Sequence, residues 1–173
     1  MPSPFKRIYD RLGDVMEETA EKYGVDIAAV LAVWKVESGP FTHEPGKAII
    51  RLENHLLWGS WGKANTDKYD LHFRHGGRGV DGKPWKNHQY RLDTDADFVP
   101  SHVNQAGEYA ALALATELAG EDVALNCISI GGPQILIKNH TILGYATLRE
   151  MYDAFQGDEA THVRGFFAFF ECK

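Results

Sequence analysis

The feature that most constrains the fold is a long apolar stretch at residues 27–38, IAAVLAVWKVES, which is followed by Gly39 and Pro40. Asp26 precedes the stretch and is a favourable N-cap residue, while glycine followed by proline ends helices. Because the stretch is apolar on almost every side, it predicts a helix buried at the centre of a domain. The chain has 173 residues, enough for one domain with a substantial core.

Helical patterns dominate most of the chain. Apolar residues recur at helical spacing over residues 4–23, where we expect a first helix. The final third predicts further helices, over residues 102–119, over 121–130, after the N-cap residue Thr147 and after the N-cap residue Asp158. The sequence therefore predicts a mainly α fold with few or no strands.

One segment departs from this pattern. Residues 59–100 are rich in Gly, Asp, Lys, His and Asn. A long polar insertion in a compact domain is usually functional or mobile, and we expect a surface loop with little regular structure. The apolar segment before it, residues 49–58, suits either a helix or a strand. We expect residues 1–173 to form a single domain.

Composition excludes several classes of protein. The formal net charge of −6 argues against a nucleic-acid binder, which needs a basic face. No apolar run approaches the roughly 20 residues that cross a bilayer, so we expect no membrane insertion. Cys127 and Cys172 lie among apolar residues and are interpreted as small buried hydrophobes. The eight histidines show no spacing typical of zinc, so we expect no metal and no cofactor.

Glu37 lies on the last predicted turn of the apolar helix, where a negative charge is unfavourable. The C-terminal end of a helix dipole repels the charge, and apolar neighbours such as Trp34 and Phe41 desolvate it. Both effects should raise the pKa of the carboxyl group and favour a proton donor near neutral pH. The alternative interpretation is a solvated glutamate at the end of a helix.

Several motifs follow one another in a distinctive order. They are Val36-Glu37-Ser38-Gly39, GKAIIRLENH at residues 46–55, Tyr109, ALNCISIGGPQI at residues 124–135, Gly144-Tyr145 and FFAFF at residues 166–170. This ordered set, over about residues 25–171, resembles the N-acetylmuramidase domain family of phage endolysins, within the lysozyme-like superfamily. Two positions depart from the family's pattern. Leu52 replaces a phenylalanine and Ile130 a tryptophan, and both remain apolar.

The resemblance implies a lysozyme-like helical domain that hydrolyses peptidoglycan. The bond would be the β-1,4 link between N-acetylmuramic acid and N-acetylglucosamine, and Glu37 would be the general acid. Glu53, in the next matched motif, is either the second carboxylate or a structural partner of His55 or Arg51. Two polar residues, Gln134 and Asn139, resemble those that bind the sugars.

The resemblance leaves other roles open. The alternative interpretation of Gln134 is the cap of its own turn, and Tyr145 either stacks on a sugar or packs in the core. Ser38 would support the turn at Glu37, and we group it with the substrate-binding residues. A lytic transglycosylase on the same fold is one rival. A non-catalytic glycan-binding or virion structural domain, indifferent to Glu37→Gln, is another.

The resemblance also implies a setting. The partner would be the glycan strands of bacterial peptidoglycan, bound by a monomer without a separate cell-wall-binding domain. The first residues, MPSPFKRIYDRLGD, lack the apolar segment of a secretory signal. We therefore expect the protein in the host cytoplasm before lysis, and at the periplasm and cell wall after passing through a holin-made hole.

Overall fold

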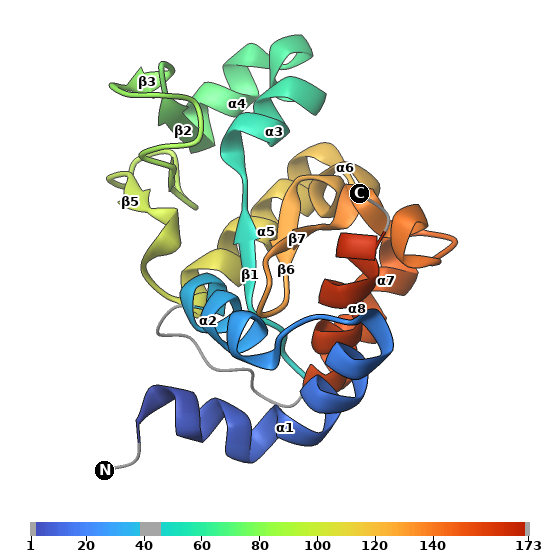
Figure 1. The fold of residues 1–173 in the computed structure, drawn as a ribbon. Helices are drawn as coiled ribbons and strands as arrows, with labels where there is room; N and C mark the ends of the chain where they lie inside the picture. Colours follow the sequence, from blue (N-terminus) through green and yellow to red (C-terminus); the bar gives the residue numbers. More distant parts are fainter. Residues whose placement is uncertain (1–2, 39–45, 172–173) are drawn as a thin grey trace. The chain divides into compact units, whose positions relative to one another are not determined.

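The computed structural model describes residues 3–38 and 46–171, without the side chains of Pro4, Glu37, Ser38 and Phe170. Most described residues are helical and the strands are short, which confirms the predicted mainly α fold with few strands (Figure 1). The chain divides into two compact units. The first unit comprises residues 1–49, 130–135 and 139–173, and the second comprises residues 50–129 and 136–138. The single catalytic domain stays a prediction.

The first unit is built from four helices whose ends follow the sequence signals. They are α1 (Pro4–Tyr23), α2 (Ile27–Ser38), α7 (Leu148–Gly157) and α8 (Glu159–Glu171). Helix α1 packs against α2 and α8, and α7 packs against α8 (Figure 1). The predicted caps form, because Asp26 Oδ1, Thr147 Oγ1 and Asp158 Oδ1 accept backbone N–H bonds of 2.8, 3.0 and 3.0 Å.

Helix α2 is not the buried central helix that the sequence predicted. Among its described side chains only Val30 and Trp34 are buried, and they pack into a cluster with α1 and α8. Val33 is 37% exposed and Val36 is 75% exposed. The apolar character of the stretch comes partly from alanines, which favour helices whether or not they are buried. Apolarity on every side was therefore a misleading guide to burial.

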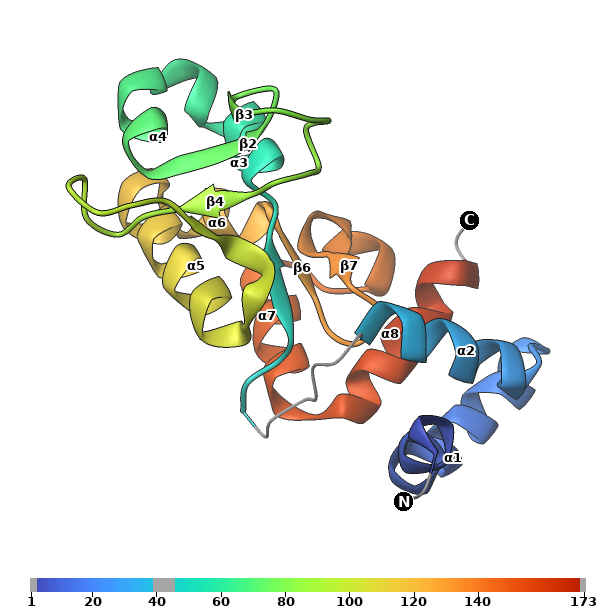
Figure 2. The same cartoon turned by 90° about the vertical axis from the view of Figure 1, so that its left-hand side faces the viewer.

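The second unit contains the polar insertion, and the expectation of little regular structure there was wrong. After β1 (Ile50–Leu52), the chain forms α3 (Asn54–Ser60), η1 (Gly62–Ala64), α4 (Thr66–His72), β2 (Phe73–Gly76), β3 (Gly79–Val80), β4 (Gln89–Tyr90) and β5 (Val99–Pro100). The last four strands form a sheet in the order β3-β2-β4-β5. Helix α4 packs against β2 (Figure 2).

Buried aromatic side chains explain why the insertion is ordered. Tyr69, Phe73 and Tyr90 are all buried there. At the start of α3, the amide of the buried Asn54 donates to two backbone carbonyls, that of Arg74 at 2.9 Å and that of Gln89 at 2.8 Å. These acceptors lie on β2 and β4, so one side chain joins α3 to both strands.

The remaining elements are η2 (Ser101–Val103), α5 (Gln105–Ala119), α6 (Glu121–Asn126), β6 (Ile128–Ile130), β7 (Ile135–Leu136) and η3 (Ile137–Leu143). The helix predicted over residues 121–130 therefore ends early, because the β-branched Ile128 and Ile130 belong to a strand. Strands β1, β6 and β7 form a second sheet in that order.

Cys127 is buried as predicted, and burial raises the pKa of its thiol to about 11. Cys172 lies outside the described residues.

Two glycines in the turn after β6, Gly131 and Gly132, leave no room for a side chain at their positions. A Cβ atom on Gly132 would lie 2.5 Å from Cζ2 of Trp34, in the first unit's core. We therefore predict that Gly132→Ala lowers the free energy of unfolding by about 1–3 kcal/mol, the usual cost of overpacking. Urea denaturation would measure this change. Gly157→Ala, where an added Cβ meets nothing within 4 Å, is the matched control and should not be destabilised. Equal stability of both variants would contradict the prediction.

Candidate active site

Glu37 lies on the last turn of α2, where the sequence placed it. The side chains of Glu37 and Ser38 lie outside the described part of the chain, so their predicted roles remain predictions. One turn before Glu37, the Trp34 side chain is buried in the first unit's core. The backbone of residue 37 lies at the C-terminal end of α2, which is the negative end of the helix dipole.

The turn that contains Gln134 follows β6 in the first unit. Gln134 has a φ of 52°, a left-handed conformation that is uncommon for residues other than glycine. Its backbone N–H and its side-chain Nε2 both donate to the carbonyl of Gly131, at 3.1 and 2.7 Å. These bonds match the interpretation that Gln134 caps its own turn. Its contact with substrate stays a prediction.

Two further predicted site residues lie in the first unit. Asn139 is half-buried on η3. The half-buried ring of Tyr145 packs edge-to-face against Phe155, with 6.4 Å between ring centroids. Burial raises the pKa of the Tyr145 hydroxyl. The Phe155 contact matches the core-packing interpretation of Tyr145, while sugar binding by Tyr145 and Asn139 stays a prediction.

Glu53 lies in the second unit, immediately before α3, and its carboxylate faces histidines. Its Oε2 lies 3.5 Å from His55 Nδ1 and 3.8 Å from His88 Nδ1. Burial raises the pKa of the Glu53 carboxyl, and the charge of His102 opposes this shift. The contact with His55 matches the structural alternative, and the role of second carboxylate stays a prediction.

Glu53 belongs to a larger group that the sequence did not reveal. We call it the Glu-His cluster, and its members are Glu53, His55, His88, His102 and Glu108. His102 bridges two of them, because its Nε2 lies 2.9 Å from His88 Nδ1 and its Nδ1 lies 2.6 Å from Glu108 Oε1. The members come from segments far apart in sequence, so no local spacing could have predicted the cluster. The high density of histidine in and beside the insertion was the one available signal.

His75 is buried in the second unit, beside Tyr69. Tyr69 donates its hydroxyl hydrogen to the backbone carbonyl of Asn54 at 2.9 Å, so the hydroxyl oxygen is left to accept from His75 Nδ1 at 2.8 Å. Burial lowers the pKa of His75 to about 4, and the charges of His55 and Arg78 act in the same direction. Asp70 opposes the shift. His75 is therefore neutral and fixed in one tautomer near neutral pH.

His75 predicts a pH dependence of stability. Its folded-state pKa of about 4 lies below the unfolded value of 6.5, so the unfolded chain binds more protons between these values. Stability should therefore fall as the pH is lowered from about 6.5 to about 4, with a contribution from His75 of about 2–3 kcal/mol. Urea denaturation of the wild type and His75→Gln across this range would measure it. An equal pH slope in both proteins would contradict the prediction.

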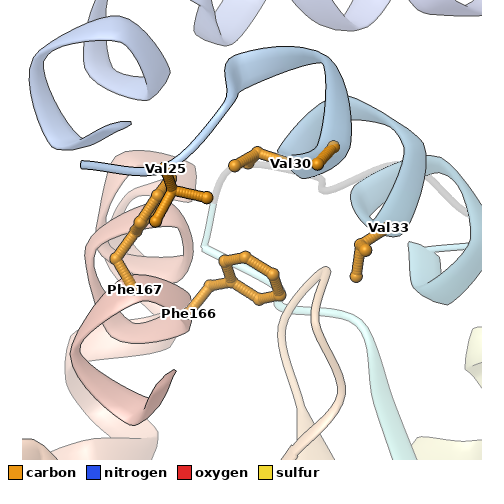
Figure 3. A pocket seen from close by; sticks show the side chains of 6 residues that line it. Val25, Val30, Val33, Phe166 and Phe167 are labelled. Atoms are coloured by element: carbon orange, nitrogen blue, oxygen red, sulfur yellow. The ribbon is translucent and has the colours of Figure 1, made fainter. Parts of the chain in front are cut away.

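A pocket of about 200 Å³ lies beside α2 in the first unit (Figure 3). Its walls are apolar, formed by Val25, Ala29, Val30, Val33, Phe166 and Phe167. Sugars require hydrogen-bonding groups on the walls that hold them, and these six side chains offer none. The pocket is therefore not suited to the glycan.

No helix in the described ranges is long and apolar enough to span a bilayer.

Comparison with known proteins agrees with the motifs. The N-acetylmuramidase family model matches residues 26–173. The solved structure of an endolysin from Burkholderia AP3 phage matches with a TM-score of 0.64 and 26% sequence identity, covering 92% of this chain and 54% of that one. The present chain thus spans about half the length of that endolysin. A comparison with curated proteins found no match.

The fold and the family match together define a lysozyme-like class of protein. The chain belongs to the N-acetylmuramidase family. The matched region includes every residue predicted for the site: Glu37, Ser38, Glu53, Gln134, Asn139 and Tyr145. Of these, Glu53 belongs to the second unit and the others to the first.

Proposed function

We propose that the protein hydrolyses the β-1,4 bond between N-acetylmuramic acid and N-acetylglucosamine in bacterial peptidoglycan. The observation that carries this proposal is the family match over residues 26–173. The likeness to a phage endolysin supports the same class of activity. In this role the protein is a bacteriolytic enzyme of phage type, acting as a monomer.

Glu37 is the general acid in this proposal. A carboxyl group at the C-terminal end of α2 is disfavoured in its charged form by the helix dipole, so it retains its proton to a higher pH. The proton passes to the glycosidic oxygen as the bond to the anomeric carbon breaks, and a water molecule supplies the new hydroxyl group at that carbon. Ser38 is the last residue of α2, and it is proposed to support the turn at Glu37.

The proposed cleavage does not require Glu53. Its Oε2 lies 3.5 Å from His55 Nδ1 and 3.8 Å from His88 Nδ1, within the Glu-His cluster. Gln134, Asn139 and Tyr145 are proposed to hold sugar units of the glycan strand. The enzyme would accumulate in the host cytoplasm and reach the cell wall at lysis.

Dye release from labelled, purified sacculi tests whether the protein is an enzyme at all. The proposal predicts release that rises with time and with enzyme concentration, together with loss of turbidity. A non-catalytic glycan-binding domain would instead sediment with the sacculi and release no dye. That result, obtained with folded protein, would overturn the proposal.

A further inference from the structure

The Glu-His cluster has the donor set and the arrangement of a metal site. We propose that Glu53, His88 and His102 bind one divalent transition-metal ion, with Zn²⁺ as the best fit. Their ligand atoms all lie within 4.8 Å of one another. Two histidines and a glutamate are a ligand set that zinc uses in proteins. This inference does not depend on the proposed hydrolase activity.

The hydrogen bonds fix which nitrogen of each histidine faces the centre of the cluster. His88 Nε2 donates to the carbonyl of Pro84 at 3.1 Å, so its Nδ1 carries the lone pair. His102 Nδ1 donates to the carboxylate of Glu108 at 2.6 Å, so its Nε2 carries the lone pair in the neutral ring. These two lone-pair nitrogens lie 2.9 Å apart. They repel each other unless a cation lies between them.

A proton on His102 or a metal ion could supply that cation, and Glu53 favours the metal. Its Oε2 lies 3.8 Å from the same His88 Nδ1 and is a third possible ligand atom. A metal ion uses such an atom, whereas a proton shared between two nitrogens does not need it. Bonds of 2.0–2.2 Å in a tetrahedral zinc site place neighbouring ligand atoms about 3.4 Å apart. The separations of 2.9 and 3.8 Å lie on either side of that value, and the third pair lies within 4.8 Å, so side-chain movements of about 1 Å would close the site.

The surroundings already orient the ligands. Ligating histidines usually donate their other N–H group to a carbonyl or a carboxylate, as His88 and His102 do here. Glu108 is buried on α5 and held in turn, because its Oε2 accepts the backbone N–H of Leu52 at 2.9 Å. Backbone bonds fix two of the segments, from Glu53 N to Cys127 O at 2.9 Å and from Ser101 N to His88 O at 3.0 Å.

The site is open enough to load from solvent. The His102 side chain is 30% exposed and that of Glu53 is 20% exposed, whereas His88 is buried. A bound ion would join the start of α3, the segment before β4, and η2. We therefore assign the ion a structural role within the second unit, holding the insertion to the start of α3.

Isothermal titration of tag-free, chelator-stripped protein with Zn²⁺ tests the site, and Co²⁺ absorption spectra report the coordination geometry. We expect one equivalent to bind, with a water molecule as the fourth ligand and visible bands typical of four-coordinate Co²⁺. A hundredfold excess of Zn²⁺ over its Kd should raise the thermal midpoint by about 5–10 °C. Absence of saturable binding by the wild type would overturn the proposal.

Three variants locate the binding. Glu53→Gln and His88→Gln should each lose most of the affinity for Zn²⁺, and Glu108→Gln should weaken it about 10–100-fold through the orientation of His102. His72→Gln is the control, because His72 bonds to the carbonyl of Arg91 outside the cluster and should leave affinity unchanged. Circular dichroism would establish that each variant is folded. Wild-type affinity in folded Glu53→Gln and His88→Gln would also overturn the proposal.

Discussion

Glu37→Gln should reduce the rate of glycan cleavage by about 10²–10⁴-fold, the usual contribution of a general acid. Glutamine keeps the size of the side chain but cannot protonate the leaving oxygen. The folded protein should be about as stable as the wild type, because glutamine resembles the protonated carboxyl group in size and in charge. Dye release from sacculi measures the rate, and thermal denaturation measures the stability.

The matched control is Glu18→Gln, which neutralises an exposed glutamate on α1 and should leave the rate unchanged. Glu37→Asp should also be slow, since the shorter side chain withdraws the carboxyl group from the bond that it protonates. Cleavage at the wild-type rate by folded Glu37→Gln would show that Glu37 is not the general acid.

Asn54→Ala should lower the free energy of unfolding by about 2–4 kcal/mol, because two partly buried backbone carbonyls lose their donors. The amide of Asn54 supplies the bonds to the carbonyls of Arg74 and Gln89, and the side chain is fully buried. Such a loss is a large part of the total stability of a domain of this size. Urea denaturation of the purified variant would measure it.

Asn65→Ala serves as the control for this loss. Asn65 is half-buried and its amide donates to one carbonyl, that of Trp61, at 3.1 Å. The expected cost is about 0.5–1.5 kcal/mol. Similar losses in the two variants would show that the bridging role of Asn54 has been overestimated.

The first unit was largely predictable because its signals are local. Asp26, Thr147 and Asp158 each cap the helix that follows them, and the bounds of α1 and α2 agree with the sequence prediction. Capping depends on residues within one turn, which a sequence displays directly. The burial of α2 was not predictable in this way, since it depends on what packs against each face.

The second unit was predicted less well because its order comes from long-range contacts. Three buried rings and the Asn54 bridges organise the insertion, and none of these contacts follows a short period in the sequence. The Glu-His cluster was missed for the same reason, since residues 53, 88, 102 and 108 meet only through the fold. Glu53 alone was singled out, through the motif around it.

Analysis of the released ends tests most directly which glycosidic bond the protein cleaves. Wild-type digests of purified sacculi would be reduced with borohydride and examined by mass spectrometry. We expect N-acetylmuramitol at the new ends, since hydrolysis at this link leaves a reducing muramic acid. Anhydro-muramic ends, which resist reduction, would assign the protein as a lytic transglycosylase. Either these ends or reduced N-acetylglucosamine would contradict the proposed hydrolysis.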